Sequence, residues 1–259
     1  EPAQGDPGPA NRGERLRPGA PPRTLAAVFA ETVERHPDVP ALDNGATSLT
    51  YAEFAEAASD LAEQLHEVGV GPGAKVGVRV RACPVLRYVA IMAILVAGGA
   101  YVPVDADDPE ERARTVFDEA DVTAIIGTDL FITVPEPKSE PKPEPQSETQ
   151  PETRPAQSLD PPGGAGADAG QPDGIPGSAG APIRPGAEPT PHDDAWVIFT
   201  SGSTGKPKGA MISYGNIRAV VPGIVERLRL GPDTTHLSYL PLCHVAEQML
   251  TTFVPIYLG

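Results

Sequence analysis

Cysteine, aromatic side chains and long apolar runs are scarce in this chain, and each scarcity excludes a class of protein. The two cysteines, Cys83 and Cys243, have no metal-type spacing and offer no disulfide framework, so we expect small core residues in a reducing, cytoplasmic compartment. The most apolar run, 88–102, is shorter than the roughly 20 residues that cross a bilayer and contains two glycines. No membrane span is therefore expected.

Positive charge is also in short supply. The formal net charge is -15, from 20 Lys and Arg against 35 Asp and Glu. Because affinity for nucleic acid comes largely from basic side chains that neutralise phosphates, we expect no nucleic acid partner. The first 22 residues have no apolar core of the kind found in a signal peptide, and we interpret them as a disordered lead-in.

Proline and glycine, in contrast, are abundant and unevenly spread. Fifteen of the 32 prolines lie from position 135 to position 191, a stretch that contains no aromatic residue. Such a segment buries too little apolar surface to offset the entropy of ordering it, so a flexible acidic insert is predicted. A solvated loop without function and a regulatory or docking segment both remain open. The predicted organisation is a lead-in at 1–22, folded parts at 23–132 and 193–259, and an insert at 133–192.

Hydrophobic periodicity predicts helices that alternate with short apolar strands. Thr24 is placed to cap a first helix, and Thr50 with Glu53 forms a capping box for a second. Further helices are expected from Pro84, from Asp108-Pro109 and over 217–228. Strands are expected at 75–80, 100–105, 122–128 and 195–200, then within 209–216, which ends in a turn; the segment 235–259 is expected to form a strand, a turn and a helix. This alternation predicts an α/β fold with a mainly parallel sheet flanked by helices.

The stretch WVIFTSGSTGKPKGAMIS, residues 196–213, joins two apolar segments through a loop of glycine, hydroxyl and lysine residues. Glycines allow close backbone approach to a ligand, and the hydroxyls and lysines suit phosphate oxygens. The loop is not a Walker A motif, because Gly205-Lys206 is followed by Pro207. The chemistry favours phosphate binding over a plain flexible connector, which composition alone does not exclude.

The segment TSGSTGKPKG, residues 200–209, resembles the phosphate loop of the adenylate-forming enzymes, which include acyl-CoA synthetases and the adenylation domains of nonribosomal peptide synthetases. LTYAEF at 49–54 is similar to a helix-start motif of this family. AGGAYVPVDADDPEERAR at 97–114 is close to the peptide synthetase form of another. The resemblance covers about 24–130 and 195–259 and implies the N-terminal part of the large domain of such an enzyme.

The resemblance implies a two-step reaction. A carboxylic acid substrate attacks Mg²⁺-ATP to form an acyl-adenylate, and the thiol of coenzyme A or of a carrier-protein phosphopantetheine then takes the acyl group. An acyl or peptidyl carrier protein is thus an implied partner. The resemblance assigns these residues to the phosphates: Thr200, Ser201, Gly202, Ser203, Thr204, Gly205 and Lys208.

The pattern LPLCHVAEQ, residues 240–248, resembles acyl-CoA and fatty-acyl ligases rather than the F-D-x-S pattern of amino-acid-selecting domains. In relatives with this pattern the histidine lies beside the acyl pocket, which implies a catalytic and pocket role for His244, with Glu247 on the same wall. We therefore expect a fatty or aromatic acid as the substrate. An amino-acid adenylation domain and a catalytically inactive remnant acting as an interaction module are the alternatives.

No residue of the chain is predicted to ligate a metal. The family's Mg²⁺-binding Thr-Glu pair, ribose-binding Asp and catalytic Lys are expected beyond position 259. We therefore do not expect residues 1–259 to catalyse the reaction by themselves.

Overall fold

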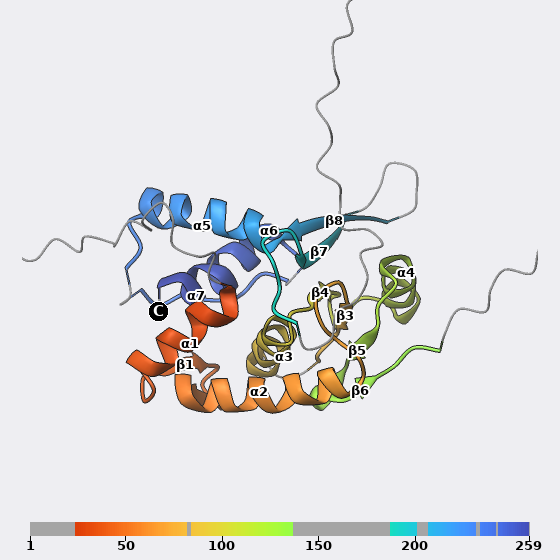
Figure 1. Ribbon diagram of the computed structural model, residues 1–259, viewed down its shortest axis with the longest axis horizontal. Coiled ribbons are helices and arrows are strands. Elements are labelled where there is room, and N and C mark those ends of the chain that lie inside the picture. The colour runs from red at the N-terminus through yellow and green to blue at the C-terminus, as the bar shows by residue number, and fades with distance from the viewer. Residues whose placement is uncertain are drawn as a thin grey trace, which may run out of the picture.

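The computed structural model describes residues 24–81, 84–136, 187–200, 207–231, 234–241 and 243–258 (Figure 1). Their centre is a six-stranded sheet with the strand order β6-β5-β3-β4-β7-β8. The four inner strands run parallel, and the edge strands β6 and β8 are each antiparallel to their neighbour. The strands are β3 (Lys75–Val78), β4 (Ala100–Pro103), β5 (Ala124–Ile126), β6 (Ile132–Thr133), β7 (Asp194–Thr200) and β8 (Lys208–Ser213). The expected mainly parallel α/β sheet is confirmed.

Helices cover both faces of the sheet. The helices in chain order are α1 (Leu25–Arg35), α2 (Tyr51–Glu67), α3 (Pro84–Val96), α4 (Glu110–Ala120), α5 (Tyr214–Leu228), α6 (Val245–Glu247) and α7 (Val254–Leu258), with a π-helical segment at Gln248–Phe253 between the last two. In Figure 1 α4 lies on one side of the sheet, while α3 lies on the other with α2 beyond it. A 3₁₀ turn, Thr128–Leu130, joins β5 to β6.

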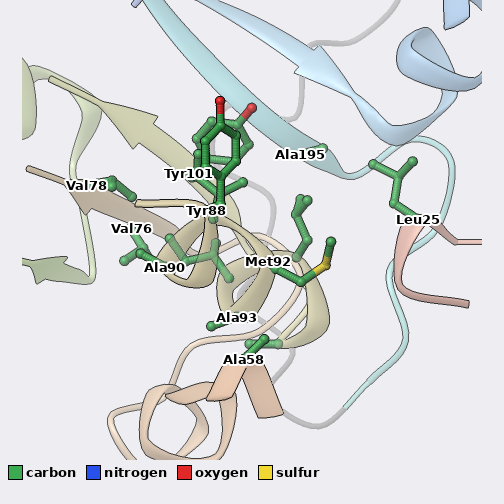
Figure 2. Packing of buried hydrophobic residues seen from close by; sticks show 14 of the residues in the cluster. Leu25, Ala58, Val76, Val78, Tyr88, Ala90, Met92, Ala93, Tyr101 and Ala195 are labelled. Carbon is green, nitrogen blue, oxygen red and sulfur yellow. The ribbon is translucent and has the colours of Figure 1, made fainter. Parts of the chain in front are cut away.

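Alternation along β4 divides the core into two clusters. Tyr101 faces the larger cluster, which α1, α2, α3, α5 and α7 share, whereas Ala100 and Val102 face α4. Successive side chains of a strand point to opposite faces, so one short strand serves both cores. Figure 2 shows the larger cluster around α3, whose buried side chains lie nearly all round the helix. This burial is the reason that α3 reads as almost continuously apolar.

The predicted helix starts agree with the structure in most cases. Thr24 caps α1 by accepting the amide of Ala27, and Thr50 with Glu53 forms the capping box of α2. The predicted start at Asp108-Pro109 is shifted slightly, because Pro109 is the cap residue of α4 and Asp108 instead pairs with Arg112.

Two expectations at the C-terminal side are wrong. The expected turn at 214–216 is the first turn of α5, because Ser213 and Asn216 form a second capping box that starts the helix there. The expected strand after position 235 does not form among the described residues of 234–241. Apolar alternation cannot make a strand unless a sheet edge is available for pairing, and there the backbone amide of Leu240 bonds instead to the carboxylate of Glu247.

The structure also contains a small sheet that the sequence did not predict. Strands β1 (Pro40–Asp43) and β2 (Ser48–Thr50) pair antiparallel on either side of the short segment 44–47. The predicted insert lies mostly outside the described residues, as does the whole lead-in. None of the described helices combines the length and the apolar character that a bilayer crossing requires.

Candidate functional site

The candidate phosphate loop lies at the closed end of the β7–β8 hairpin. Thr200, the last residue of β7, is paired directly with Lys208, the first residue of β8. Both side chains are exposed. The intervening positions Ser201, Gly202, Ser203, Thr204 and Gly205, all predicted phosphate contacts, lie outside the described residues. The structure thus places the two ends of the predicted loop beside each other.

The loop emerges at the carboxyl edge of the parallel strands, because β7 runs parallel to β4. Ligands of open α/β sheets bind outside this edge, where the connections after the strands converge. The hydroxyl of Thr200 and the ammonium of Lys208 suit a polyphosphate there.

Gly209 has a packing role that the sequence did not reveal. A Cβ added at this position would lie 2.9 Å from Cζ of Phe199 on the paired strand. The glycine therefore lets the Phe199 ring lie across the base of the hairpin. Close approach to a neighbouring side chain accounts for this glycine in the described structure.

The second candidate region is the turn that carries Cys243 and His244. The amide of His244 donates to the carbonyl of Pro241 at 2.9 Å, and its own carbonyl accepts from the amide of Gln248 at 3.2 Å. The His244 side chain is exposed at the start of α6. The turn is thus closed by backbone bonds on both sides of the histidine and presents it outward.

Electrostatics connect this turn to the loop that follows β4. Partial burial raises the pKa of the Cys243 thiol, and the negative charges of Asp105 and Asp108 raise it further. These carboxylates can act on the thiol only if the turn lies near the carboxyl end of β4. A thiol with a raised pKa stays protonated at neutral pH. Cys243 was expected in the core, whereas the structure leaves it only partly buried.

Glu247 occupies a different environment from His244. Its side chain is 2% exposed. Its carboxylate accepts hydrogen bonds from the hydroxyl of Ser238 and, at 3.2 Å, from the amide of Leu240. The sequence placed Glu247 on a pocket wall beside His244, whereas the structure places it beneath the turn with its carboxylate engaged by protein donors.

A second buried polar group lies next to this one. The phenol of Tyr101 donates to Oε1 of Gln248 at 2.6 Å, and Thr252 donates to the same oxygen at 3.0 Å. Full burial raises the pKa of Tyr101 well above its ordinary value, so the phenol stays neutral. The sequence gave no sign of these partners, because they come from β4 and from a π-helical segment almost 150 positions later.

A cavity of about 570 Å³ lies at the other edge of the sheet, between α4 and strands β5 and β6. Its lining includes Arg79, Glu110, Phe117 and Ile125. Arg79 holds the pKa of Glu110 below its ordinary value through a hydrogen bond and its positive charge. None of the predicted site residues lines this cavity, so we do not assign it to the site.

Comparison with known proteins agrees with this arrangement. The family model described as AMP-binding enzyme matches residues 29–259. The chain belongs to the AMP-binding enzyme family. The match confirms the resemblance drawn from the three sequence motifs and spans both folded parts.

Several AMP-binding relatives are peptide synthetases. Tyrocidine synthase 3 of Brevibacillus parabrevis is 35% identical over 217 residues, which are 83% of this chain and 3% of that protein. Enterobactin synthase component F of Escherichia coli O157:H7 is 32% identical over 196 residues, which are 74% of this chain and 13% of that protein. The chain thus spans only a small part of the length of these relatives.

A solved AMP-binding structure has the same fold. The nonribosomal peptide synthetase FmoA3, in a form bound to AMPPNP, superposes with a TM-score of 0.65 and 26% identity over 91% of this chain and 22% of that one. The N-terminal subdomain of NpsA from Klebsiella oxytoca superposes with a TM-score of 0.59 at 20% identity, a likeness of fold alone. These findings favour the peptide synthetase alternative over the acyl-CoA synthetase interpretation.

Proposed function

We propose that this chain is the N-terminal part of an adenylation domain that activates a carboxylic acid with ATP and delivers it to the phosphopantetheine thiol of a carrier protein. The observation that carries the proposal is the sequence TSGSTGKPKG at the closed end of the β7–β8 hairpin, on the carboxyl edge of the sheet. Relatives that are peptide synthetases support a carrier protein over free coenzyme A. The folded parts of the domain are 23–132 and 193–259, separated by the insert at 133–192.

In this proposal the loop binds the triphosphate. Thr200, Lys208 and the five predicted contacts between them supply hydroxyls, amides and one ammonium, with Thr204 and Lys208 contributing most. An oxygen of the substrate carboxylate bonds to the α-phosphorus, and the bond to the β-phosphate oxygen breaks to release pyrophosphate. Negative charge moves onto the leaving pyrophosphate, where fixed donors and an ammonium stabilise it.

Mg²⁺ accompanies ATP in this family, and we tested whether the described residues fit it. No group of three or more His, Cys, Asp or Glu side chains in the described ranges has the arrangement of a metal site. We therefore assign no Mg²⁺ ligand among the described residues.

The acid that we propose lacks an α-amino group, as an aromatic or fatty acid does. The sequence LPLCHVAEQ has no aspartate to bind an ammonium. Glu247, the carboxylate nearest to His244 along the chain, already accepts from Ser238 and Leu240. Using it for a substrate ammonium would break these bonds, so His244 is left to contact the reacting carboxylate.

The test is carboxylate-dependent exchange of labelled pyrophosphate into ATP, with separate pools of aromatic, fatty and amino acids. We expect exchange with the aromatic or fatty pool in the protein that carries this chain, and we would run the 259 residues alone in parallel. Exchange only with amino acids would overturn the substrate proposal and leave adenylation standing. No exchange with any pool, in a sample shown to be folded and to contain the whole domain, would overturn adenylation itself.

A further inference from the structure

The buried carboxylate of Glu247 holds residues 234–241 in place through hydrogen bonds, although these residues form neither a helix nor a strand. It accepts from the hydroxyl of Ser238 and from the backbone amide of Leu240, nine and seven positions earlier in the chain. Thr251, four positions later, also lies 3.0 Å from it through its hydroxyl. One carboxylate therefore satisfies donors on both sides of the turn and takes the place of the missing strand ladder.

Helix α3 anchors this group to the core. The hydroxyl of Tyr88 lies 2.8 Å from Oγ of Ser238 and 2.9 Å from Oγ1 of Thr251. In Figure 2 the hydroxyl ends of Tyr88 and Tyr101 point the same way, away from the apolar side chains around them. The hydrogen-bonded side chains of Glu247, Ser238 and Thr251 thus lie at the edge of the larger core cluster, where Tyr88 of α3 holds them in place.

The contacts of Glu247 enclose the turn that carries His244. The chain leaves the carboxylate at Leu240, passes through Pro241 and His244, and returns to the carboxylate at Glu247 itself. Directly after Glu247 the helix widens into the π-helical segment Gln248–Phe253. Such irregular turns occur often at functional sites, and here Gln248 and Thr252 bond to the neighbouring Tyr101 group.

We propose that Glu247 is a positioning residue that fixes the His244 turn at the carboxyl edge of the sheet, and that it does not contact the substrate. The proposal rests on the proposed function, because it gives the turn a part in adenylation. The carboxylate is buried and engaged, whereas the imidazole of His244 is exposed. Glu247 therefore acts on the reaction only through the place that it gives to His244.

The substitution Glu247→Gln tests this with little change in volume. The carboxylate accepts from Ser238 and Leu240 through different oxygens, so an amide that keeps the bond from Leu240 turns its NH₂ group toward Ser238, whose hydroxyl must then reverse its bond and give up its present arrangement with Tyr88. We expect amide hydrogen exchange of a peptide that covers 238–244 to become about tenfold faster, while α3 and β4 are unchanged. The matched control is Glu63→Gln on the exposed side of α2.

The fluorescence of Trp196, the single tryptophan and a fully buried one, shows whether each variant is folded. If Glu247→Gln does not fold, Ser238→Ala removes one of the same bonds from an exposed residue. Its expected effect has the same direction. Unchanged hydrogen exchange at 238–244 in a folded variant would overturn the proposal.

A double-mutant cycle in the pyrophosphate exchange assay separates positioning from direct contact. Glu247→Gln is expected to lower kcat/KM for the acid about tenfold in the wild-type background, but less than about twofold in a His244→Ala background. Independent, multiplying effects would show that Glu247 acts without His244 and would overturn the proposal. If the wild-type protein, folded and containing the whole domain, shows no pyrophosphate exchange, the proposed function fails, while the hydrogen-exchange result still decides whether Glu247 positions the turn.

Discussion

At the scale of single residues, a role can be predicted from the sequence where it depends on the side chain's own functional group. Lys208 and Thr200 were assigned to the phosphates through the resemblance of the loop to the adenylate-forming enzymes, and the structure sets them opposite each other at the closed end of a hairpin. Glu247 was expected on a pocket wall because it follows His244 by about one helical turn. Its partners Ser238 and Leu240 lie earlier in the chain, in a segment whose alternation suggested a strand. The role of a buried polar residue depends on its partners, and spacing alone does not reveal them.

The residue-scale prediction concerns the phosphate loop. Lys208→Ala and Thr204→Ala are each expected to lower kcat/KM for ATP in pyrophosphate exchange by about 10-fold to 100-fold, because a hydrogen bond to a charged group contributes about 1.5–3 kcal/mol. The matched control is Lys75→Ala, since Lys75 begins the inner strand β3 and therefore lies at the amino end of the parallel strands, away from the loop at their carboxyl end. Wild-type exchange rates in both loop variants would contradict the assignment of phosphate binding.

At the scale of elements, local signals fixed most helix starts. The capping box of α2 is complete: the amide of Thr50 donates to Glu53 at 2.8 Å, and the Thr50 hydroxyl accepts from the Glu53 amide at 3.2 Å. The same chemistry at Ser213 and Asn216 starts α5, but there it was missed because glycine and asparagine at 215–216 suggested a turn. Strands were harder, because a strand forms only where another strand is available for pairing.

The element-scale prediction concerns the start of α2. Thr50→Ala is expected to lower the free energy of unfolding by about 1 kcal/mol, measured by denaturant titration with Trp196 fluorescence, whereas Thr47→Ala on the neighbouring exposed turn has little effect.

The cost of Thr50→Ala is also expected to depend on pH. Hydrogen bonds from the backbone and then the side chain of Thr50 lower the pKa of Glu53. This part of the stability is present above the unfolded pKa and is lost as the pH falls through the lowered folded pKa. The cost of Thr50→Ala should therefore be smaller in acid. Of the two bonds to the carboxylate, only the one from the Thr50 hydroxyl is lost in this variant, because the backbone amide remains, so an equal cost at every pH would show that the bond from the hydroxyl to the carboxylate adds nothing to the cap.

At the scale of the whole molecule, helices pack on both faces of the sheet, and the side chains between a strand and a helix must be small enough for this approach. Gly77 in β3 shows how close α4 comes, since a Cβ added there would lie 2.7 Å from Cε1 of Phe117. On the other face Trp196 stacks on Tyr101 with ring centroids 6.1 Å apart. The two cores are therefore joined through the same few central strands.

The molecule-scale prediction tests this close packing. Gly77→Ala is expected to lower the free energy of unfolding by about 1–3 kcal/mol, because the added methyl group overpacks the interface with Phe117. In a Phe117→Leu background, Gly77→Ala should lower the free energy of unfolding by less, because the ring that the added methyl group meets is gone. The same substitution at Gly223 in α5, where nothing lies within 4 Å of the added Cβ, should raise stability by about 0.5–1 kcal/mol. Equal effects at the two glycines would rule out packing as the cause.

The sequence by itself determined the family, most of the helix caps, and the alternation of helices and strands, and it predicts the phosphate-loop residues. These features depend on neighbours within a few positions, through capping bonds, periodicity and the chemistry of one loop. Only the tertiary structure decided that β1 pairs with β2, that 234–241 has no ladder, and that Glu247 lies under the His244 turn. These features depend on which backbone and side-chain groups come within hydrogen-bonding distance, even where the partners are only seven or nine positions apart, and that is settled when the helices pack on the sheet.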